Sequence, residues 1–121
     1  QLVPGLIELF VRLSTEAASP DHPAHDYFQH RYERIRRTTA KALGAAVADG
    51  HLRADLDAET AALRLTSLMD GLQLQWLLDR SVDMAGAIRG TLVEWMTPTG
   101  RAAFEACTPR RVPVPDSPER P

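Results

Sequence analysis

The sequence has a single cysteine, Cys107, which leaves no second thiol for an internal disulfide. This cysteine usage fits a reducing cytoplasm, where we expect the protein to reside. No apolar run approaches the roughly 20 residues that a membrane-spanning helix needs. The chain also does not open with the charged and then apolar segments of a signal peptide. Neither a disulfide scaffold nor a membrane partner is therefore predicted.

Excess positive charge is also missing, which argues against a nucleic-acid-binding domain. Fourteen Lys and Arg residues against sixteen Asp and Glu residues give a net charge of −2, whereas a domain that holds a phosphate backbone usually carries clustered positive charge. The nearest approach to a cluster is Arg31, Arg34, Arg36 and Arg37. These arginines spread around a helix with Glu33 among them, which predicts a solvated face with local ion pairs.

Catalytic motifs are absent too. The sequence contains no Gly-rich phosphate loop, no nucleotide-binding motif and no Ser-His-Asp order, and Cys107 has no evident base beside it. His22, His25 and Asp26 have a spacing that places two imidazoles and a carboxylate on one helical turn. We interpret them as the solvated start of a helix. We therefore predict no enzyme, no metal site and no cofactor.

What the chain does contain is helical patterning throughout. Its 121 residues suffice for one domain, and 44% hydrophobic with 25% charged residues is ordinary for a soluble globular protein. Apolar residues at three- and four-residue steps predict a first helix from about Leu2 to Ser19, with Pro4 in its first turn. The predicted fold class is all-α, an antiparallel helical bundle.

Capping residues mark the other helices. We predict a second helix with Asp21 as N-cap and Pro23 in its first turn, ending where Gly50 supplies a left-handed C-terminal residue. A third helix runs from the cap residue Asp57 to about residue 79, and a fourth, capped by residue 81 or 83, ends near Trp95. The predicted domain spans residues 1–97. Residues 98–121 are expected to form a short helix and a Pro-rich, extended or disordered tail.

The third helix is apolar on nearly every side, and the fourth carries two glycines four residues apart. A helix that is apolar all round is buried all round, and helix-interior glycines, which cost about 1 kcal/mol each, permit another helix to approach closely. We therefore expect a two-fold dimer interface. Its candidate residues are Leu65, Met69, Leu72, Trp76, Gly86, Gly90 and Val93. The alternative is that these residues form only the core of the monomer.

Aromatic and adaptable side chains suggest a ligand pocket between the first three helices. Small-molecule sites are mostly apolar with a few polar groups, and Met, Tyr and Trp suit such walls. The candidate lining residues are Phe10, Phe28, Tyr32, Met69, Gln73 and Trp76. The alternative is that this aromatic stripe is plain core.

Four segments together resemble the regulatory domain of TetR/AcrR-type regulators. They are the helix start at residues 21–32 (DHPAH, then YF and RY), the link at 50–57 (GHLRADLD), the helix at 62–79 with MDGLQLQWLL, and the helix start at 82–84. The ordered match covers roughly residues 1–96, and the closest variety is BetI-like or actinobacterial AcrR-like.

This resemblance implies an all-helical domain that dimerises through its last two long helices and holds an apolar effector pocket. It further implies that operator DNA is bound only through an N-terminal helix-turn-helix, which does not precede Gln1 here. We therefore expect a fragment that senses a small, mostly apolar effector and forms a homodimer. The alternative is a structural helical dimerisation module without a ligand.

Overall fold

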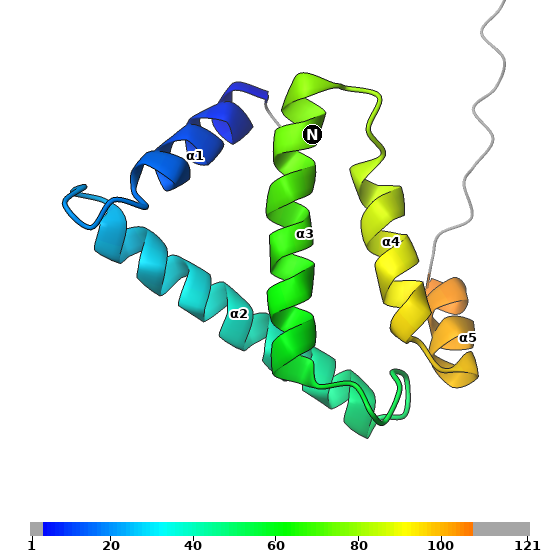
Figure 1. Cartoon of the computed structure of the whole chain (residues 1–121). Coiled ribbons are helices and arrows are strands. Elements are labelled where there is room, and N and C mark those ends of the chain that lie inside the picture. Colours follow the sequence, from blue (N-terminus) through cyan, green and yellow to red (C-terminus); the bar gives the residue numbers. More distant parts are fainter. Residues whose placement is uncertain (1–3, 108–121) are drawn as a thin grey trace, which may run out of the picture.

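The computed structural model describes residues 4–107, which form five helices (Figure 1). In chain order these are α1 (Pro4–Glu16), α2 (His25–Ala48), α3 (Ala58–Leu78), α4 (Met84–Trp95) and α5 (Pro98–Cys107). Between residues 4 and 107 no strand forms, and an isolated antiparallel bridge joins Leu52 to Met96. The predicted all-α class is confirmed. The predicted Pro-rich tail lies outside the described residues from position 108 onward.

Helix α3 is the central element of the domain. It contacts α1 on one side and α4 on the other, and α2 crosses the end of α3 at which the helix begins (Figure 1). Helices α3 and α4 run in opposite directions, since the short turn at residues 79–83 reverses the chain. Helices α1, α2 and α4 therefore share α3 as a common packing partner.

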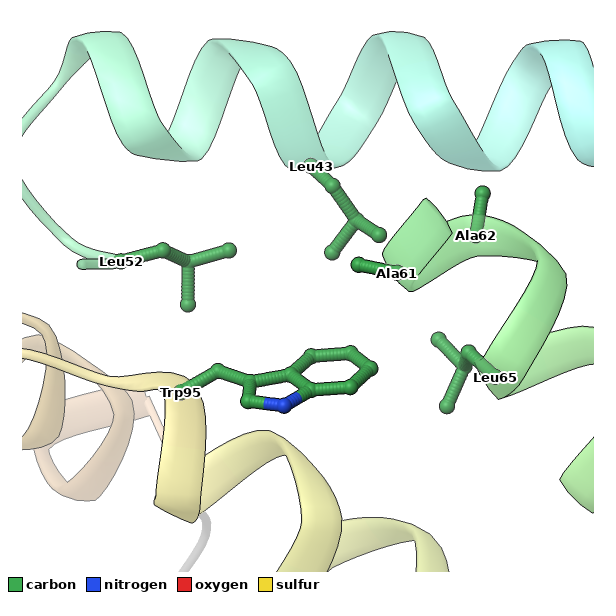
Figure 2. Packing of buried hydrophobic residues seen from close by; sticks show 6 residues of the cluster. All are labelled: Leu43, Leu52, Ala61, Ala62, Leu65 and Trp95. Atoms are coloured by element: carbon green, nitrogen blue, oxygen red, sulfur yellow. The ribbon is translucent and has the colours of Figure 1, made fainter. Parts of the chain in front are cut away.

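The hydrophobic core lies where α2, α3 and α4 meet. Figure 2 shows six of its side chains, which are Leu43, Leu52, Ala61, Ala62, Leu65 and Trp95. The Trp95 ring points from the end of α4 toward α3, and the small Ala62, with no exposed surface, lets α2 approach α3 closely. One large ring and two alanines thus fill the same layer.

The link between α2 and α3 follows the sequence prediction at both of its ends. Gly50 has φ 77°, the left-handed conformation that glycine adopts without strain. The carboxylate of Asp57 caps α3 by accepting hydrogen bonds from the backbone N–H of Glu59 (3.1 Å) and the hydroxyl of Thr60 (2.9 Å). Both predicted helix boundaries are confirmed.

The same link is bonded to the corner between α4 and α5. The backbone N–H of Arg53 donates to the carbonyl of Trp95 (2.9 Å), and that of Thr97 donates to the carbonyl of His51 (2.9 Å). The hydroxyl of Thr97 donates to the carbonyl of Gly50. These bonds fix the end of α4, and with it Trp95, against the link.

The start of α2 differs from the prediction. Helix α1 ends at Glu16, residues 17–24 form turns, and α2 begins at His25, so Asp21 is not its N-cap. Two histidines organise this connection instead. Nδ1 of His22 accepts from the N–H of Ala24 (3.1 Å), and Nδ1 of His25 donates to the carbonyl of Ala17 (2.8 Å). The imidazole hydrogen bonds hold a turn where the sequence suggested a helical cap.

Between Pro4 and Cys107, no helix combines the length and the apolar character required to cross a bilayer.

Candidate ligand-binding site

A cleft of about 160 Å³ lies between α1, α2 and α3, and we call it the central cleft. One of its lining residues comes from α1, three come from α2 and four from α3. They are Phe10, Arg31, Tyr32, Ile35, Thr66, Met69, Asp70 and Gln73. Because three helices supply the wall, the shape of the cleft depends on how these helices pack.

Aromatic contacts hold the apolar wall of the central cleft in place. The rings of Phe10 and Phe28 meet edge to face, with centroids 5.4 Å apart and planes inclined by 66°. Phe28 is buried, and the Tyr27 ring also meets it edge to face, with centroids 5.3 Å apart. Edge-to-face ring pairs contribute about 0.5–1.5 kcal/mol beyond area burial. These ring contacts therefore fix the position of the Phe10 ring in the cleft wall.

The polar part of the cleft centres on Tyr32 and Asp70. Burial, together with a hydrogen bond to the Asp70 carboxylate and the charge of that carboxylate, raises the pKa of Tyr32 from an ordinary value near 10 to about 12. A hydrogen bond with Ser14 and the positive charge of Arg31 act in the opposite direction on the same pKa. At neutral pH the phenol is thus protonated and donates to Asp70.

Arg31 lines the same cleft from α2. Its guanidinium carbon lies 4.8 Å from the centroid of the Phe10 ring, in cation–π geometry. Its Nε is buried and has no hydrogen-bond acceptor. No carboxylate among residues 4–107 lies within ion-pair distance of this guanidinium. The cation is therefore stacked on a ring and has no acceptor for its buried Nε–H.

A second hollow, of about 350 Å³, adjoins the central cleft. The two share Phe10, Tyr32, Asp70 and Gln73, and the second is completed by Val11, Ser14, Thr15 and Leu74. The Tyr32–Asp70 pair thus stands where the two spaces meet. A more open hollow of about 520 Å³ lies elsewhere, lined mainly by charged side chains of α2 and the start of α3. That lining offers little surface to an apolar molecule.

Four of the six predicted pocket residues line the central cleft together. These are Phe10, Tyr32, Met69 and Gln73. Phe28 lies behind Phe10 and borders a separate shallow hollow at the α1–α2 turn. Trp76 lines neither hollow, and its ring packs under the guanidinium of Arg80 at 4.0 Å. That any of the six contacts a ligand stays a prediction.

Half of the cleft wall was not predicted from the sequence, namely Arg31, Ile35, Thr66 and Asp70. A signal for Arg31 exists, because it lies three residues after Phe28 and four before Ile35, on the apolar face of α2. Asp70 similarly lies four residues after Thr66 on α3. The other arginines fit the prediction better, since the guanidinium of Arg37 pairs with the exposed carboxylate of Glu33 at 3.0 Å.

The residues predicted for a dimer interface divide into two groups. Leu65 and Leu72 are only 9% and 7% exposed, so their side chains are covered by the chain's own helices and have little area left for a second copy. Met69 is 40% exposed but belongs to the cleft wall, and Trp76 is half-buried beneath Arg80. On α3, two of the predicted residues are thus covered by the chain and two are partly accessible, and their role in a dimer interface stays a prediction.

On α4, two of the predicted interface residues are exposed and the third is half-buried. A β-carbon at Gly86 would meet the carboxylate of Asp83, which caps α4 by accepting from the Gly86 N–H at 2.9 Å. The lack of a side chain at position 86 thus has an explanation inside the chain. Gly90 has nothing within 4 Å of such a β-carbon, and Val93 is half-buried. Gly90 therefore marks open space on this helix.

The exposed apolar surface of α3 lies on another line of the helix. Leu63, Leu74 and Leu78 are 52%, 49% and 82% exposed, and we call them the outer row of α3. Their spacing of eleven and four residues keeps them on one face of the helix. This row carries apolar side chains that the described chain leaves uncovered.

The histidines near the start of α2 are committed to backbone contacts. His22 accepts from Ala24, and His25 donates to Ala17. Within residues 4–107, no group of three His, Cys, Asp or Glu side chains is arranged to hold a metal ion.

Comparison with known proteins yields one match. The family model of the C-terminal domain of BetI-type transcriptional repressors, in the TetR group, matches residues 8–96. This span contains the central cleft, the outer row of α3 and the whole of α4. No curated protein and no solved structure matches the chain.

Proposed function

Because the chain belongs to the TetR family, as a BetI-type repressor C-terminal domain, we propose that it binds a small, mostly apolar effector in the central cleft and pairs with a second copy through α3 and α4. The family consists of transcriptional regulators and is not enzymatic. The family assignment implies a regulatory role in a transcriptional repressor. The location of the effector and the surface of the dimer are our proposal.

The central cleft supports the location of the effector. Ligand sites are mostly apolar hollows with a few polar groups that fix orientation, and this cleft combines Phe10, Ile35 and Met69 with the Tyr32–Asp70 pair. The single observation that carries the proposal is that three helices meet around the central cleft. A molecule bound there contacts all three of them.

The surface of the dimer follows from exposure. The outer row of α3 presents three leucines that the described chain leaves about half or more exposed, and α4, which packs on α3, has open space at Gly90. Burial of apolar area contributes about 25 cal/mol per Å², so a second copy that covers such a row gains stability. We place the interface on the outer row of α3 and on α4 at Gly90 and Val93, and leave Leu65 and Leu72 to the core.

Helix α3 couples the two functions. Met69, Asp70 and Gln73 of α3 line the cleft, whereas Leu74 and Leu78 of the same helix belong to the outer row. An effector that favours one position of α3 shifts the equilibrium between two arrangements of the dimer, to the extent of its differential affinity. In the repressor, this shift changes the spacing of two helix-turn-helix heads, which dock about 34 Å apart on DNA.

A thermal-unfolding screen against a panel of apolar metabolites tests the effector site. A compound that binds only the folded state stabilises it by RT ln(1 + [L]/Kd), about 2.7 kcal/mol at a hundred times Kd. We expect at least one compound to raise the unfolding midpoint of the wild-type chain. Met69→Trp should abolish this shift by filling the cleft, and Leu9→Trp, on the exposed side of α1, should preserve it.

Two results would contradict the effector proposal. A shift that survives Met69→Trp would place the ligand outside the central cleft. A panel without any shift, for a chain that still sediments as a dimer, would favour a ligand-free dimerisation module.

A further inference from the structure

Arg31 has a buried N–H donor, on Nε, without an acceptor at the wall of the central cleft. A guanidinium carries five N–H donors and no acceptor. In the described chain it stacks on Phe10 at 4.8 Å, and neither an ion pair nor a side-chain hydrogen bond joins it to another residue. A buried donor without an acceptor costs about 1–3 kcal/mol. An acceptor supplied by a ligand would remove that cost.

Three other polar side chains of the central cleft, those of Tyr32, Asp70 and Thr66, are already engaged with the chain. The Tyr32 phenol is hydrogen-bonded to Asp70, and the Thr66 hydroxyl donates to the carbonyls of Ala62 (2.9 Å) and Leu63 (3.2 Å). The remaining polar side chain, Gln73, is neutral, so the buried Nε–H of the Arg31 cation is the strongest free donor among the lining residues. Charge-assisted hydrogen bonds are about twice as strong as neutral ones, and the planar guanidinium suits a carboxylate or a carbonyl oxygen.

We propose that the effector is an amphipathic molecule that presents a carboxylate or amide-type oxygen to Arg31 and packs its apolar body against Phe10, Ile35 and Met69. This inference rests on the effector site proposed above and specifies its ligand class. The oxygen accepts from the guanidinium, and the apolar body fills the space between the Phe10 ring and α3. A modest cleft of about 160 Å³ suits a single ring or a short chain.

A cationic ligand fits this cleft less well. An ammonium group brings no acceptor, so the buried Nε–H of Arg31 would stay unsatisfied next to a second positive charge. The Asp70 carboxylate, the acidic side chain of the cleft wall, is already hydrogen-bonded by Tyr32. The central cleft therefore favours a ligand that brings a hydrogen-bond acceptor for Arg31.

Three matched probes test the ligand class by isothermal titration calorimetry. Hydrocinnamate, hydrocinnamamide and phenylpropylammonium share one ring and one linker and differ in the head group. We expect the carboxylate and the amide to bind at least about tenfold more tightly than the ammonium, which corresponds to one charge-assisted hydrogen bond. Equal affinities for the three head groups, including undetectable binding of all three, would overturn the proposal.

Variants of α2 test the role of Arg31 itself. Arg31→Gln should weaken hydrocinnamate binding at least about tenfold. Arg34→Gln removes the same charge from an exposed position of the same helix and should leave binding unchanged. If Arg31→Gln does not fold, Arg31→Lys keeps the charge, loses the planar fork, and should still weaken binding. An equal loss in the Arg34 variant would indicate a general charge effect and overturn the proposal.

The two proposals fail in different ways. Tighter binding of the ammonium, abolished by Met69→Trp, would refute the acceptor class and leave the effector site standing. Binding of any probe that Met69→Trp does not affect would count against the effector site itself.

Discussion

Gly100 lies against the backbone carbonyl of His51, so closely that a β-carbon at position 100 would overlap both atoms of that carbonyl group. The same His51 oxygen accepts the N–H of Thr97 at 2.9 Å. Because the contact is between backbone atoms, rotation of a side chain cannot relieve the overlap. The contact joins the first turn of α5 to the link after α2.

Gly100→Ala should therefore destabilise the domain by about 1–3 kcal/mol, the usual range for overpacking. Urea unfolding followed by circular dichroism measures the change. Gly44→Ala is the matched control, because a β-carbon there makes an ordinary contact of 3.8 Å with Cβ of Ala58. That variant should be neutral or up to about 1 kcal/mol more stable. Equal stability of the two variants would contradict the described packing of α5.

Trp95 is the largest side chain of the core. Trp95→Ala should cost about 3–5 kcal/mol, since it leaves a cavity between the link, α2 and α3. Trp76→Ala removes an identical side chain from a half-buried site under Arg80 and should cost clearly less. The free energies of unfolding in urea give the comparison. A larger loss at Trp76 would show that the core is centred elsewhere, or that the dimer contributes there.

The proposed dimer surface predicts that one lysine substitution weakens dimerisation and that a second, on another helix, does not. Leu78→Lys, on the outer row of α3, should weaken dimerisation at least about tenfold, because it places a charge in an apolar interface. Leu6→Lys alters a similarly exposed leucine on α1 and should leave the dimer intact. Sedimentation equilibrium measures both dissociation constants.

Gly90→Leu tests the α4 side of the same surface. The monomer has room for the side chain, since nothing lies within 4 Å of a β-carbon at position 90. We therefore expect weaker association without loss of monomer stability. A wild-type chain that sediments as a monomer at tens of micromolar, or unchanged association in both interface variants, would refute this interface.

Local signals in the sequence were sufficient where a boundary depends on nearby residues. Gly50 and Asp57 act through their own backbone conformation and a hydrogen bond two or three residues away, so the link after α2 was predictable. Asp21 is also a typical N-cap residue, but α2 begins later, after a turn held by a contact between residues farther apart in the chain. The bond from His25 to the carbonyl of Ala17 spans eight residues, and no local pattern announces it.

The faces of α3 and the charged cleft residue required tertiary structure. An all-round apolar helix gives no preferred direction, so Leu65 and Leu63 were equivalent in sequence, although one is 9% and the other 52% exposed. Arg31 looked like one of several solvated arginines. Only the position of α1 brings Phe10 beneath its guanidinium and turns it into part of the cleft.

The phenol of Tyr32 provides a test of the cleft that needs no ligand. Its pKa of about 12 in the folded state lies above the ordinary value near 10, so between these pH values the native chain keeps a proton that the unfolded chain loses. The free energy of unfolding should therefore fall as the pH rises from about 10 to about 12, while below this window the stabilising contribution of Tyr32 is fully present.

The titration of Tyr32 can also be followed directly. In a Tyr27→Phe background, tyrosinate absorbance after a pH jump reports Tyr32 alone. Asp70→Asn should lower the titration midpoint part of the way toward 10, because burial remains, whereas Asp79→Asn, at the exposed end of α3, should not change it. A Tyr32 that titrates near 10 in the folded chain, or that ignores Asp70→Asn, would mean that the two side chains do not meet in the cleft.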